Sequence, residues 1–370
     1  MLDMRVNNMH IYVHVPFCDS ICSYCDFFRV KTTPQLIDKY IEALRKEINL
    51  YDIKNIKTIY FGGGTPSALS VNQIDELLSL FDRYLDNVEE YTFEANPENL
   101  DIEKLRILKK HGVNRISLGV QTLNDKLLVL LNRKHRSEDV LGIINLIHSV
   151  GIHNISIDMM YALPYQSVEE FKDHLATIVN WPITHVSIYS LTIEEHSEFA
   201  RKHIDALDNE LEGIMYEEGV RILEENGFIR YEVANFGREN YHSRHNLGYW
   251  NYDPYYGLGP GAVGFIDNVR YENTHNLVDY FDGKYRIEEE YTDLKEQMFE
   301  YIMVGLRKCE GISLQSYYDK FNVHLDEVYK DAIQKNINKG WLEINNGNLR
   351  ATKDGMQFLH TVLIDFMSDD

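Results

Sequence analysis

Three of the four cysteines of the chain lie in one stretch, Ile11-Tyr12-Val13-His14-Val15-Pro16-Phe17-Cys18-Asp19-Ser20-Ile21-Cys22-Ser23-Tyr24-Cys25-Asp26-Phe27, where they are spaced CxxxCxxC. The alternating run before them, His10–Val15, predicts a β-strand. Thiolates are soft ligands that suit zinc or iron–sulfur clusters. A structural zinc site normally closes with four protein ligands, whereas three cysteines on one tight loop leave one position of a metal centre open. The stretch therefore predicts an open metal centre after the first strand.

Two other interpretations of the cysteines stay open at this point. The thiols could be buried structural residues, although structural cysteines have no reason to cluster on a loop that follows a proline. Alternatively, His14 could complete a four-ligand zinc site, unless it is a hydrogen-bonded histidine of the core. The remaining cysteine, Cys309, falls in a late helical pattern and is expected to be an ordinary buried thiol.

The composition is that of a globular protein, with 44% hydrophobic residues among 370, enough for one large domain and a smaller one. Lys and Arg number 37 against 58 for Asp and Glu, so the formal net charge of −21 argues against nucleic acid as a partner. The first nine residues lack the apolar core of a signal peptide, and no apolar run reaches the roughly 18 residues that a membrane span requires. Because the clustered cysteines suit metal ligation in a reducing compartment, we expect a cytoplasmic protein without a transmembrane segment.

Strand-like and helical patterns alternate through the first half of the chain. The predicted strands are His10–Val15, Ile56–Phe61, Tyr91–Glu94, Arg115–Gly119, Asn154–Asp158 and His185–Ser190. The predicted helices between them are Leu36–Leu50, Val71–Leu85, Ile102–His111, Ser137–Val150 and Val168–Val179. Six strand–helix units predict a parallel sheet with right-handed crossovers. Since a complete barrel of this kind needs eight units, we expect an α/β fold with an open, partial (β/α)6 TIM-like barrel.

Polar residues and glycines follow the predicted strands, at the end where such barrels carry out their chemistry. The second strand leads into Gly62-Gly63-Gly64-Thr65-Pro66, whose backbone groups lie unshielded for a ligand. The next three strands end at or lead into Glu94, Gln121 and Asp158, and Arg133 lies on the helix after the fourth strand. Any one of these could be an ordinary loop residue. Polar residues after successive strands together predict a ligand site.

The second half of the chain changes character after a long predicted helix, Asp208–Asn226. The aromatic- and glycine-rich stretch that ends at Gly264 is expected to be compact, irregular and to cover the open side of the barrel. Further helical patterns and the hairpin signal Asn346-Gly347 predict a small C-terminal domain that resembles a winged helix. We therefore expect a core barrel over residues 1–232, a covering segment over 233–288 and a helix-plus-hairpin domain over 289–370.

These motifs resemble those of the radical S-adenosylmethionine (SAM) superfamily, whose CxxxCxxC signature follows a first strand. The run Tyr12–Cys18 is similar to the branch that contains the oxygen-independent coproporphyrinogen III oxidases and the HemW-like haem chaperones. The resemblance implies a partial (β/α)6 radical SAM barrel and a [4Fe-4S] cluster held by Cys18, Cys22 and Cys25. It also implies SAM contacts by the residues that match the family's SAM site, which are Tyr12, Tyr24, Gly63, Gly64, Thr65, Glu94, Gln121, Arg133 and Asp158.

Two places in the sequence favour the chaperones over the oxidases. Phe27 stands where the oxidases have another cysteine, and the first strand begins near residue 10, without the oxidases' longer N-terminal arm. The run His245-Asn246-Leu247-Gly248-Tyr249-Trp250 matches the HNxxYW motif of the HemW-like chaperones, so the resemblance implies His245 as a haem-binding residue. Alternatively, His245 makes only local hydrogen bonds and the two aromatic residues belong to the core.

The resemblance thus implies a radical SAM-type haem chaperone that binds a [4Fe-4S] cluster, SAM and haem as cargo. Its partners would be recipient haemoproteins, including membrane-bound respiratory enzymes, and oxidase activity is not expected. The alternatives are an oxygen-independent coproporphyrinogen III oxidase, another radical SAM enzyme such as a methyltransferase, or a homologue that holds no cluster.

Overall fold

The computed structural model describes residues 8–367. The expectation that the first nine residues form no signal peptide therefore falls mostly outside the described residues. The six predicted strands are present as β1 (Met9–Val15), β4 (Ile56–Gly63), β5 (Glu90–Ala95), β6 (Arg115–Gln121), β7 (Asn154–Tyr161) and β8 (His185–Ser190). Each pairs in parallel with the next one along the chain. The expected partial (β/α)6 barrel is confirmed.

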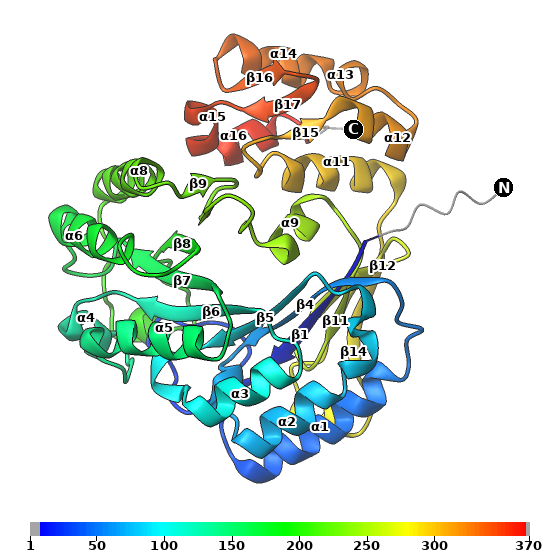
Figure 1. The fold of residues 1–370 in the computed structure, drawn as a ribbon. Helices are drawn as coiled ribbons and strands as arrows, with labels where there is room; N and C mark the ends of the chain where they lie inside the picture. The colour runs from blue at the N-terminus through cyan, green and yellow to red at the C-terminus, as the bar shows by residue number, and fades with distance from the viewer. Residues whose placement is uncertain (1–7, 368–370) are drawn as a thin grey trace.

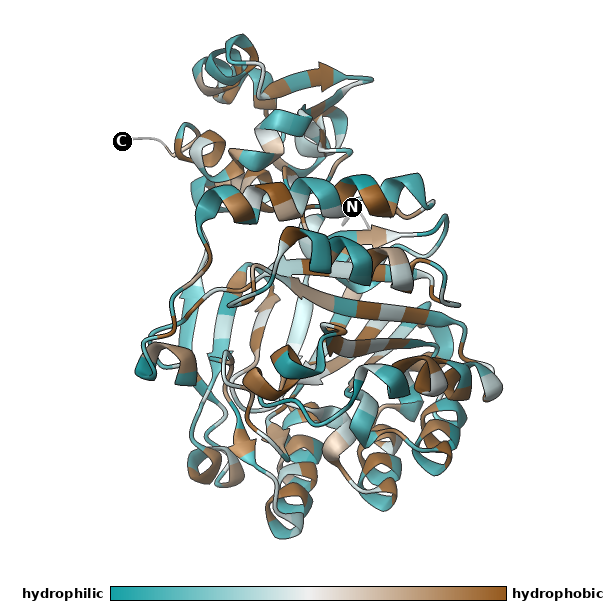
Figure 2. Cartoon of the chain, turned by 90° about the vertical axis from the view of Figure 1, so that its left-hand side faces the viewer, coloured by the Kyte–Doolittle hydropathy of each residue, from teal (hydrophilic) through white to brown (hydrophobic). Residues whose placement is uncertain are grey.

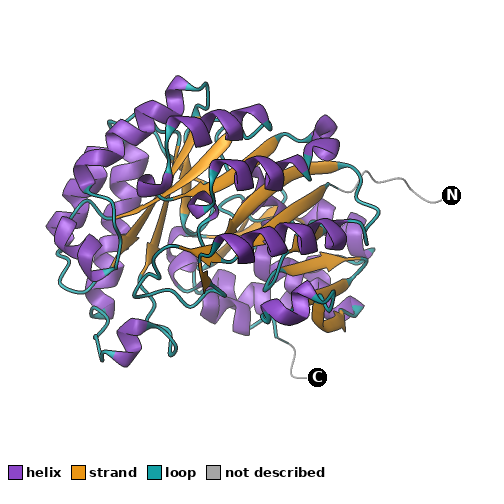
Figure 3. Ribbon diagram, turned by 90° about the horizontal axis from the view of Figure 1, so that it is seen from below, coloured by secondary structure: helices purple, strands orange, loops and turns teal. Residues whose placement is uncertain are grey.

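Helices connect these strands and pack around the outside of the sheet (Figure 3). They are α1 (Pro34–Ile48), α2 (Val71–Ser79), α3 (Ile102–Lys110), α4 (Asp125–Leu130), α5 (Val140–Ser149) and α6 (Val168–Ile178). In α1 the apolar side chains Ile37, Ile41 and Leu44 recur at helical spacing and are buried. Figure 2 shows the resulting bands of hydrophobic residues along the strands and helices.

The helix predicted over Val71–Leu85 is shorter than expected. It begins with a capping box, in which Ser70 and Gln73 satisfy each other's backbone N–H groups. It ends at Ser79, and the chain continues as a 3-10 helix over Asp82–Asn87. The chain turns at Phe81, whose side chain is fully buried, so burial of this ring takes precedence over continuation of the α-helix.

The glycine-rich stretch that was expected to be irregular forms two strands joined by an irregular turn, in which Gly259 and Gly261 have positive φ angles of 93° and 78°. The expectation was therefore wrong for the strands. Strands β11 (Tyr255–Leu258), β12 (Val263–Ile266), β13 (Val269–Asn273) and β14 (Arg286–Tyr291) extend the sheet beyond β1, and β11 runs parallel to β1. A Cβ atom on Gly257 would lie 1.9 Å from the carbonyl oxygen of Val263, and one on Gly264 would lie 2.2 Å from the ring of Tyr271. These glycines permit close packing between strands rather than turns.

The segment before these strands places one helix, α9, at the amino-terminal end of the barrel. The segment comprises α7 (Glu198–Arg201), α8 (Asn209–Glu225), β9 (Ile229–Arg230), β10 (Asn235–Gly237) and α9 (Arg244–Trp250), and α10 (Leu277–Phe281) follows later. Glu90, the first residue of β5, accepts hydrogen bonds from the backbone N–H groups of Arg244 at 2.9 Å and His245 at 3.0 Å. Helix α9 is therefore anchored where the strands begin, between the sheet and the C-terminal part of the chain (Figure 1).

The C-terminal part has a hydrophobic core of its own, which includes Ile302, Tyr317, Leu349 and Val362. Its elements are α11 (Leu294–Gly305), β15 (Ile312–Ser313), α12 (Leu314–Phe321), α13 (Leu325–Val328), α14 (Lys330–Asn338), β16 (Leu342–Asn345), β17 (Asn348–Ala351), α15 (Lys353–Gln357) and α16 (Leu359–Ile364). The predicted hairpin is present, with positive φ angles of 50° at Asn346 and 79° at Gly347. The domain boundaries at 232 and 288 stay a prediction.

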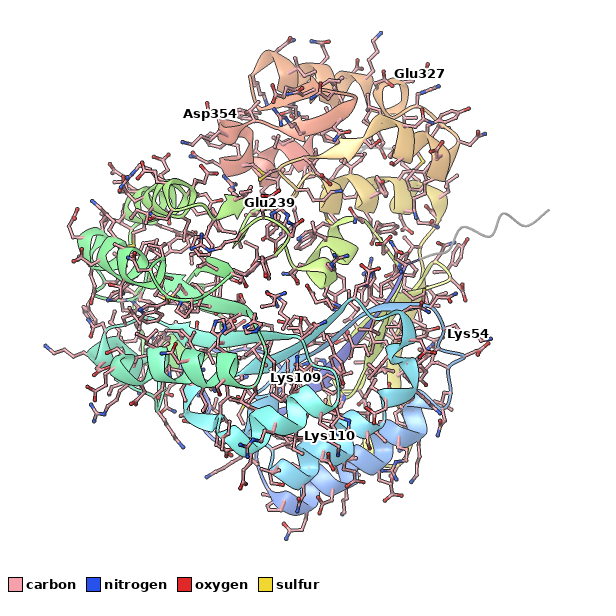
Figure 4. All side chains as sticks on the ribbon, viewed as in Figure 1. Lys54, Lys109, Lys110, Glu239, Glu327 and Asp354 are labelled. Carbon is pink, nitrogen blue, oxygen red and sulfur yellow. The ribbon has the colours of Figure 1, made fainter. Side chains whose placement is uncertain are left out.

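Charged side chains cover the outer surface, as Figure 4 shows for Lys110 on α3, Glu327 on α13 and Asp354 on α15. No helix within residues 8–367 combines the length and the apolar character that crossing a membrane requires.

Cys309 is half-buried in the turn after α11, not within a helix as expected.

Candidate functional site

The loop that carries Cys22 and Cys25 is fixed at its base and at its far side. It begins after the short strand β2 (Phe17–Cys18) and ends at β3 (Val30–Lys31), which pairs with β2 in a separate two-stranded sheet. At the far side, the backbone N–H of Ser23 donates to the carbonyl oxygen of Leu131 at 3.2 Å. The loop is therefore held against the chain that follows α4.

A cavity of about 350 Å³ lies between this loop and the carboxyl ends of the strands. Cys18, Cys22 and Cys25 all line it. It is also lined by eight of the nine predicted SAM contacts, which are Tyr24, Gly63, Gly64, Thr65, Glu94, Gln121, Arg133 and Asp158. Residues from the cysteine loop and from the ends of four strands thus meet in one place, as the rule for parallel barrels predicts.

Burial disfavours the thiolate form of two of the three cysteines. Burial raises the pKa of Cys18 to about 11, although the hydrogen bond that Thr65 Oγ1 donates to Cys18 Sγ at 3.5 Å lowers it in part. Burial also raises the pKa of Cys25, against the positive charge of Arg29. Free buried thiols are poor nucleophiles, whereas a bound metal takes them as thiolates. These cysteines are therefore suited to metal ligation rather than to covalent catalysis.

The interpretation of His14 as a zinc ligand has no support in the geometry. His14 Nε2 donates to the carbonyl oxygen of Phe28 at 2.9 Å, which leaves Nδ1 as an acceptor for the hydroxyl group of Tyr12 at 3.0 Å. Both nitrogens of this buried ring are engaged. Within residues 8–367, no three His, Cys, Asp or Glu side chains converge closely enough to hold a single metal ion. A cubane cluster offers each cysteine a different iron atom and so accepts a wider spacing.

Tyr12 is the one predicted SAM contact that does not line the cavity. Besides its hydrogen bond to His14, its ring packs 6.1 Å from the ring of Tyr60, inside the barrel. Burial, followed by the neighbouring charge of Glu94, raises the pKa of the Tyr12 phenol far above its usual range. Tyr12 lies one layer below the cavity, and its role as a SAM contact stays a prediction.

Two half-buried carboxyl groups give the cavity its electrostatic character. Glu94 accepts hydrogen bonds from the hydroxyl of Tyr60 at 2.6 Å and from the N–H of Gly63 at 3.2 Å. Burial raises the pKa of Glu94 to about 7, although the hydrogen bond from Tyr60 opposes the increase and the nearby Asp158 adds to it. Burial likewise raises the pKa of Asp158, which accepts hydrogen bonds from Ser117 at 3.1 Å. Such a pair favours a ligand with positive charge or hydroxyl donors.

Arg133 lines the cavity from the loop after α4, not from a helix as expected, and carries an unpaired hydrogen-bond donor. Its Nη2 donates to Asn96 Oδ1 at 2.8 Å and to the carbonyl oxygen of Gly119, and its Nη1 lies 3.6 Å from Cys22 Sγ. Its Nε is buried and has no partner among the described residues. Because an unpaired buried donor is costly, this atom fits an anionic group of a ligand beside the cysteines.

The glycines after β4 serve packing as well as ligand access. A Cβ atom on Gly63 would lie 2.5 Å from the His14 ring, and one on Gly64 would lie 2.8 Å from the backbone of Pro16. The absence of side chains therefore lets this loop pack against the end of β1 and brings Thr65 to Cys18.

Sequence reasoning missed Tyr189, near the end of β8, which lines the cavity and donates a 2.7 Å hydrogen bond to Gln121. The strand-end rule, applied to the sixth strand as well, would have found it. Gln121 itself has a positive φ of 68°. That conformation follows the irregular pairing between the ends of β6 and β7, and it turns the amide towards Tyr189.

His245 lies at the opposite end of the barrel from the cysteines and is not part of this cavity. Its Nδ1 lies 2.6 Å from the hydroxyl oxygen of Thr58, and its Nε2 lies 3.0 Å from that of Tyr249. Its ring stacks on Tyr60 with a centroid distance of 5.0 Å. Burial lowers the pKa of His245 well below its usual value. The geometry supports the alternative in which this histidine hydrogen bonds locally, and its role towards haem stays a prediction.

The fold and the cysteine cavity define a radical SAM protein. The family model described as Radical SAM superfamily matches residues 12–178, and the model described as HemN C-terminal domain matches residues 292–358. The chain is 38% identical to the haem chaperone HemW of Lactococcus lactis subsp. lactis, over 97% of each chain. It is 35% identical to the haem chaperone HemW of Bacillus subtilis, over 93% of this chain and 95% of that one. The chain therefore belongs to the HemW-like family of radical SAM proteins.

A solved structure supports the fold. The chain superposes on the coproporphyrinogen III oxidase HemN of Escherichia coli with a TM-score of 0.86, at 19% identity, over 97% of this chain and 90% of that one. At this identity the likeness shows the fold alone. Family membership implies a [4Fe-4S] cluster and SAM as cofactors.

Proposed function

We propose that this protein is a haem chaperone, which binds haem and delivers it to haemoproteins. The observation that carries the proposal is the identity of 38%, over almost the whole length, to a relative of that name. Similarity over both the barrel and the C-terminal part supports a shared function better than a match to the barrel alone would. As finer proposals, the protein acts in the cytoplasm and its recipients include membrane-bound respiratory enzymes.

Within this proposal, Cys18, Cys22 and Cys25 hold the [4Fe-4S] cluster and leave one iron atom for SAM. When bound, such a cluster supplies the electron for reductive cleavage of SAM. The cavity is suited to both groups because its three cysteines lie beside an unpaired buried donor, Nε of Arg133. We propose that Arg133 binds the SAM carboxylate and that Glu94 accepts hydrogen bonds from its ribose.

Six further predicted SAM contacts take their proposed roles from the family resemblance and from the chemistry of their side chains. The backbone at Gly63 and Gly64, with the Thr65 side chain, would bind the SAM amino group, and Asp158 would accept hydrogen bonds from polar groups of SAM. Tyr24 and Gln121 would close the cavity around the ligand. Phe27 lines the same cavity at the position of the extra cysteine in the oxidases, which supports a chaperone over an oxidase.

A haem-transfer experiment tests this function. The full chain is purified anaerobically, its cluster is reconstituted, and haemin is added while the Soret band is followed. We expect saturable binding, and then transfer of the haem to an apo-haemoprotein such as apomyoglobin. A chain that binds no haem contradicts the proposal. Formation of protoporphyrinogen from coproporphyrinogen III, SAM and a reductant would instead support the oxidase.

A further inference from the structure

A second cavity, of about 430 Å³, lies between α9, the strands β11 and β12, and helix α11. The side chains of Tyr60, His245 and Tyr249 lie between this cavity and the cysteine cavity. Tyr60 donates a hydrogen bond to Glu94 in the cysteine cavity and stacks on His245. His245 is in turn within hydrogen-bond distance of Tyr249, which lines the second cavity. Broad apolar side chains form most of its lining, namely Tyr249, Trp250, Tyr252, Tyr255, Phe265 and Met303. This volume and this composition are typical of binding sites for small molecules and cofactors.

One arginine, Arg270, lines the cavity together with the carboxylates of Asp253 and Glu300, and a second, Arg307, lies beside the aromatic wall. Arg307 is exposed and its guanidinium lies 5.1 Å from the centre of the Trp250 ring. Arg270 lines the cavity and donates a 2.8 Å hydrogen bond to Glu300. The Trp250 indole N–H is buried and has no partner among the described residues. A planar ligand that carries carboxylates at one edge would match both the aromatic walls and these donors.

One side chain of the lining offers a soft donor for a metal. The phenol oxygens of Tyr249 and Tyr252 are engaged, by His245 at 3.0 Å and Glu300 at 2.6 Å. Met303, on α11, lines the cavity with a thioether, which is one of the axial ligands that proteins use for haem iron. The cavity thus combines aromatic walls, a thioether and the ion pair of Arg270 with Glu300.

We propose that this cavity is the haem site, with the macrocycle between the aromatic side chains, the propionates at Arg307 and Arg270, and Met303 as the protein ligand of the iron. The proposal rests on the proposed function and locates the haem-binding site that this function requires. Haem would then bind at the end of the barrel opposite the cysteines, and on the other side of Tyr249 from His245.

Filling the cavity tests its location. Val304 lines the cavity from α11, whereas Val278 on α10 is 66% exposed and does not line it. We expect Val304→Phe to weaken haemin binding about tenfold or more in a Soret titration, since an added ring occupies the space of the macrocycle. The control Val278→Phe should bind haemin as the unaltered chain does.

The cation at the edge gives a test that does not depend on repacking. Arg307→Gln should weaken the binding of haemin about tenfold, but not that of haemin dimethyl ester, which lacks free carboxylates. Arg83→Gln is a matched control, because Arg83 is also exposed and also lies over a ring, 4.8 Å from that of Tyr84. In the reduced protein, Met303→Leu should change the haem spectrum, whereas the exposed Met367→Leu should not.

The outcomes separate this proposal from the function on which it rests. If the unaltered chain shows no haemin binding, the chaperone function fails. If it binds haemin and Val304→Phe and Arg307→Gln bind equally well, the function stands and this site is wrong. Retention of the cluster absorbance and of the circular dichroism spectrum establishes that each variant is folded.

Discussion

The Nε2 atom of His245 lies 3.0 Å from the phenol oxygen of Tyr249. The hydroxyl oxygen of Thr58 lies 2.6 Å from the other ring nitrogen, Nδ1. Iron could therefore coordinate this histidine only after one of these two contacts breaks. The same contact joins the barrel to the aromatic cavity, since Tyr249 lines that cavity. His245 is thus placed to hold a wall of the cavity in position, whereas the sequence motif alone suggests a ligand.

Replacing His245 with alanine tests this positioning role. We expect His245→Ala to lower the free energy of unfolding by about 2–4 kcal/mol, because a buried side chain and its hydrogen bonds are lost. The wavelength of the haem Soret maximum should not change. Urea denaturation and haemin titration measure the two quantities, and His196→Ala, at an exposed histidine, is the control. A shifted Soret maximum without loss of stability would restore His245 as the iron ligand.

The assignment of the cluster ligands has a direct test. Cys22→Ala should abolish the broad visible absorption of the reconstituted protein, because two thiolates hold a cubane poorly. Cys309→Ala is the matched control, since Cys309 is half-buried in the turn after α11 and does not line the cysteine cavity. Iron and sulfide analysis checks the result independently. A full complement of both in Cys22→Ala would refute the assignment.

The role of Glu94 predicts how SAM binding depends on pH. The pKa of Glu94 is raised to about 7, so its carboxylate form, the better acceptor, increases as the pH rises through 7. The affinity for SAM should therefore rise between pH 6 and 8 in the unaltered chain and change less in Glu94→Gln. At pH 8 the variant should bind about tenfold more weakly, which equals the loss of one charge-assisted hydrogen bond.

Calorimetric titration with SAM measures these affinities. Glu89→Gln serves as the control, because Glu89 is exposed, directly precedes β5 and does not line the cavity. Titration of SAM's own amino group affects all variants equally, so it cancels in the comparison with Glu94→Gln. Equal pH profiles for Glu94→Gln and the unaltered chain would remove Glu94 from the SAM site.

The cysteine cavity could be predicted from the sequence because its parts follow a local rule. Glu94 and Asp158 fall near the carboxyl ends of two parallel strands, β5 and β7, and the carboxyl ends of such strands meet at one edge of the sheet. The position of α9 could not be predicted in this way. It depends on Glu90 capping the helix from 154 residues earlier in the chain. Likewise, the glycines in and after β11 suggested irregular backbone because the strand partner of β11, β1, lies far away in sequence.

A buried carboxyl group outside both cavities predicts how stability depends on pH. Glu47, on α1, accepts hydrogen bonds from Tyr280 at 2.6 Å, Asn273 at 2.6 Å and the N–H of Gly259 at 2.9 Å, and so ties α1 to the strands beyond β1. Burial nevertheless raises its pKa to about 7, against these hydrogen bonds. The burial cost of the charged form therefore exceeds what the hydrogen bonds return.

Because the pKa of Glu47 is higher in the folded than in the unfolded chain, the folded state binds more protons between about pH 4.5 and 7. Its stabilising contribution is fully present below that range and is lost as the pH rises through 7. From this group alone, the free energy of unfolding should fall by ~3 kcal/mol between pH 5 and 8. Glu47→Gln, which cannot ionise, should lack this part of the fall. Urea denaturation of both proteins at the two pH values isolates the effect, since other groups cancel in the difference.

The control for this measurement is Glu42→Gln, at an exposed glutamate of the same helix, which should behave as the unaltered chain does. A fall in the free energy of unfolding of Glu47→Gln that equals the fall in the unaltered chain would show that Glu47 is ionised throughout this pH range.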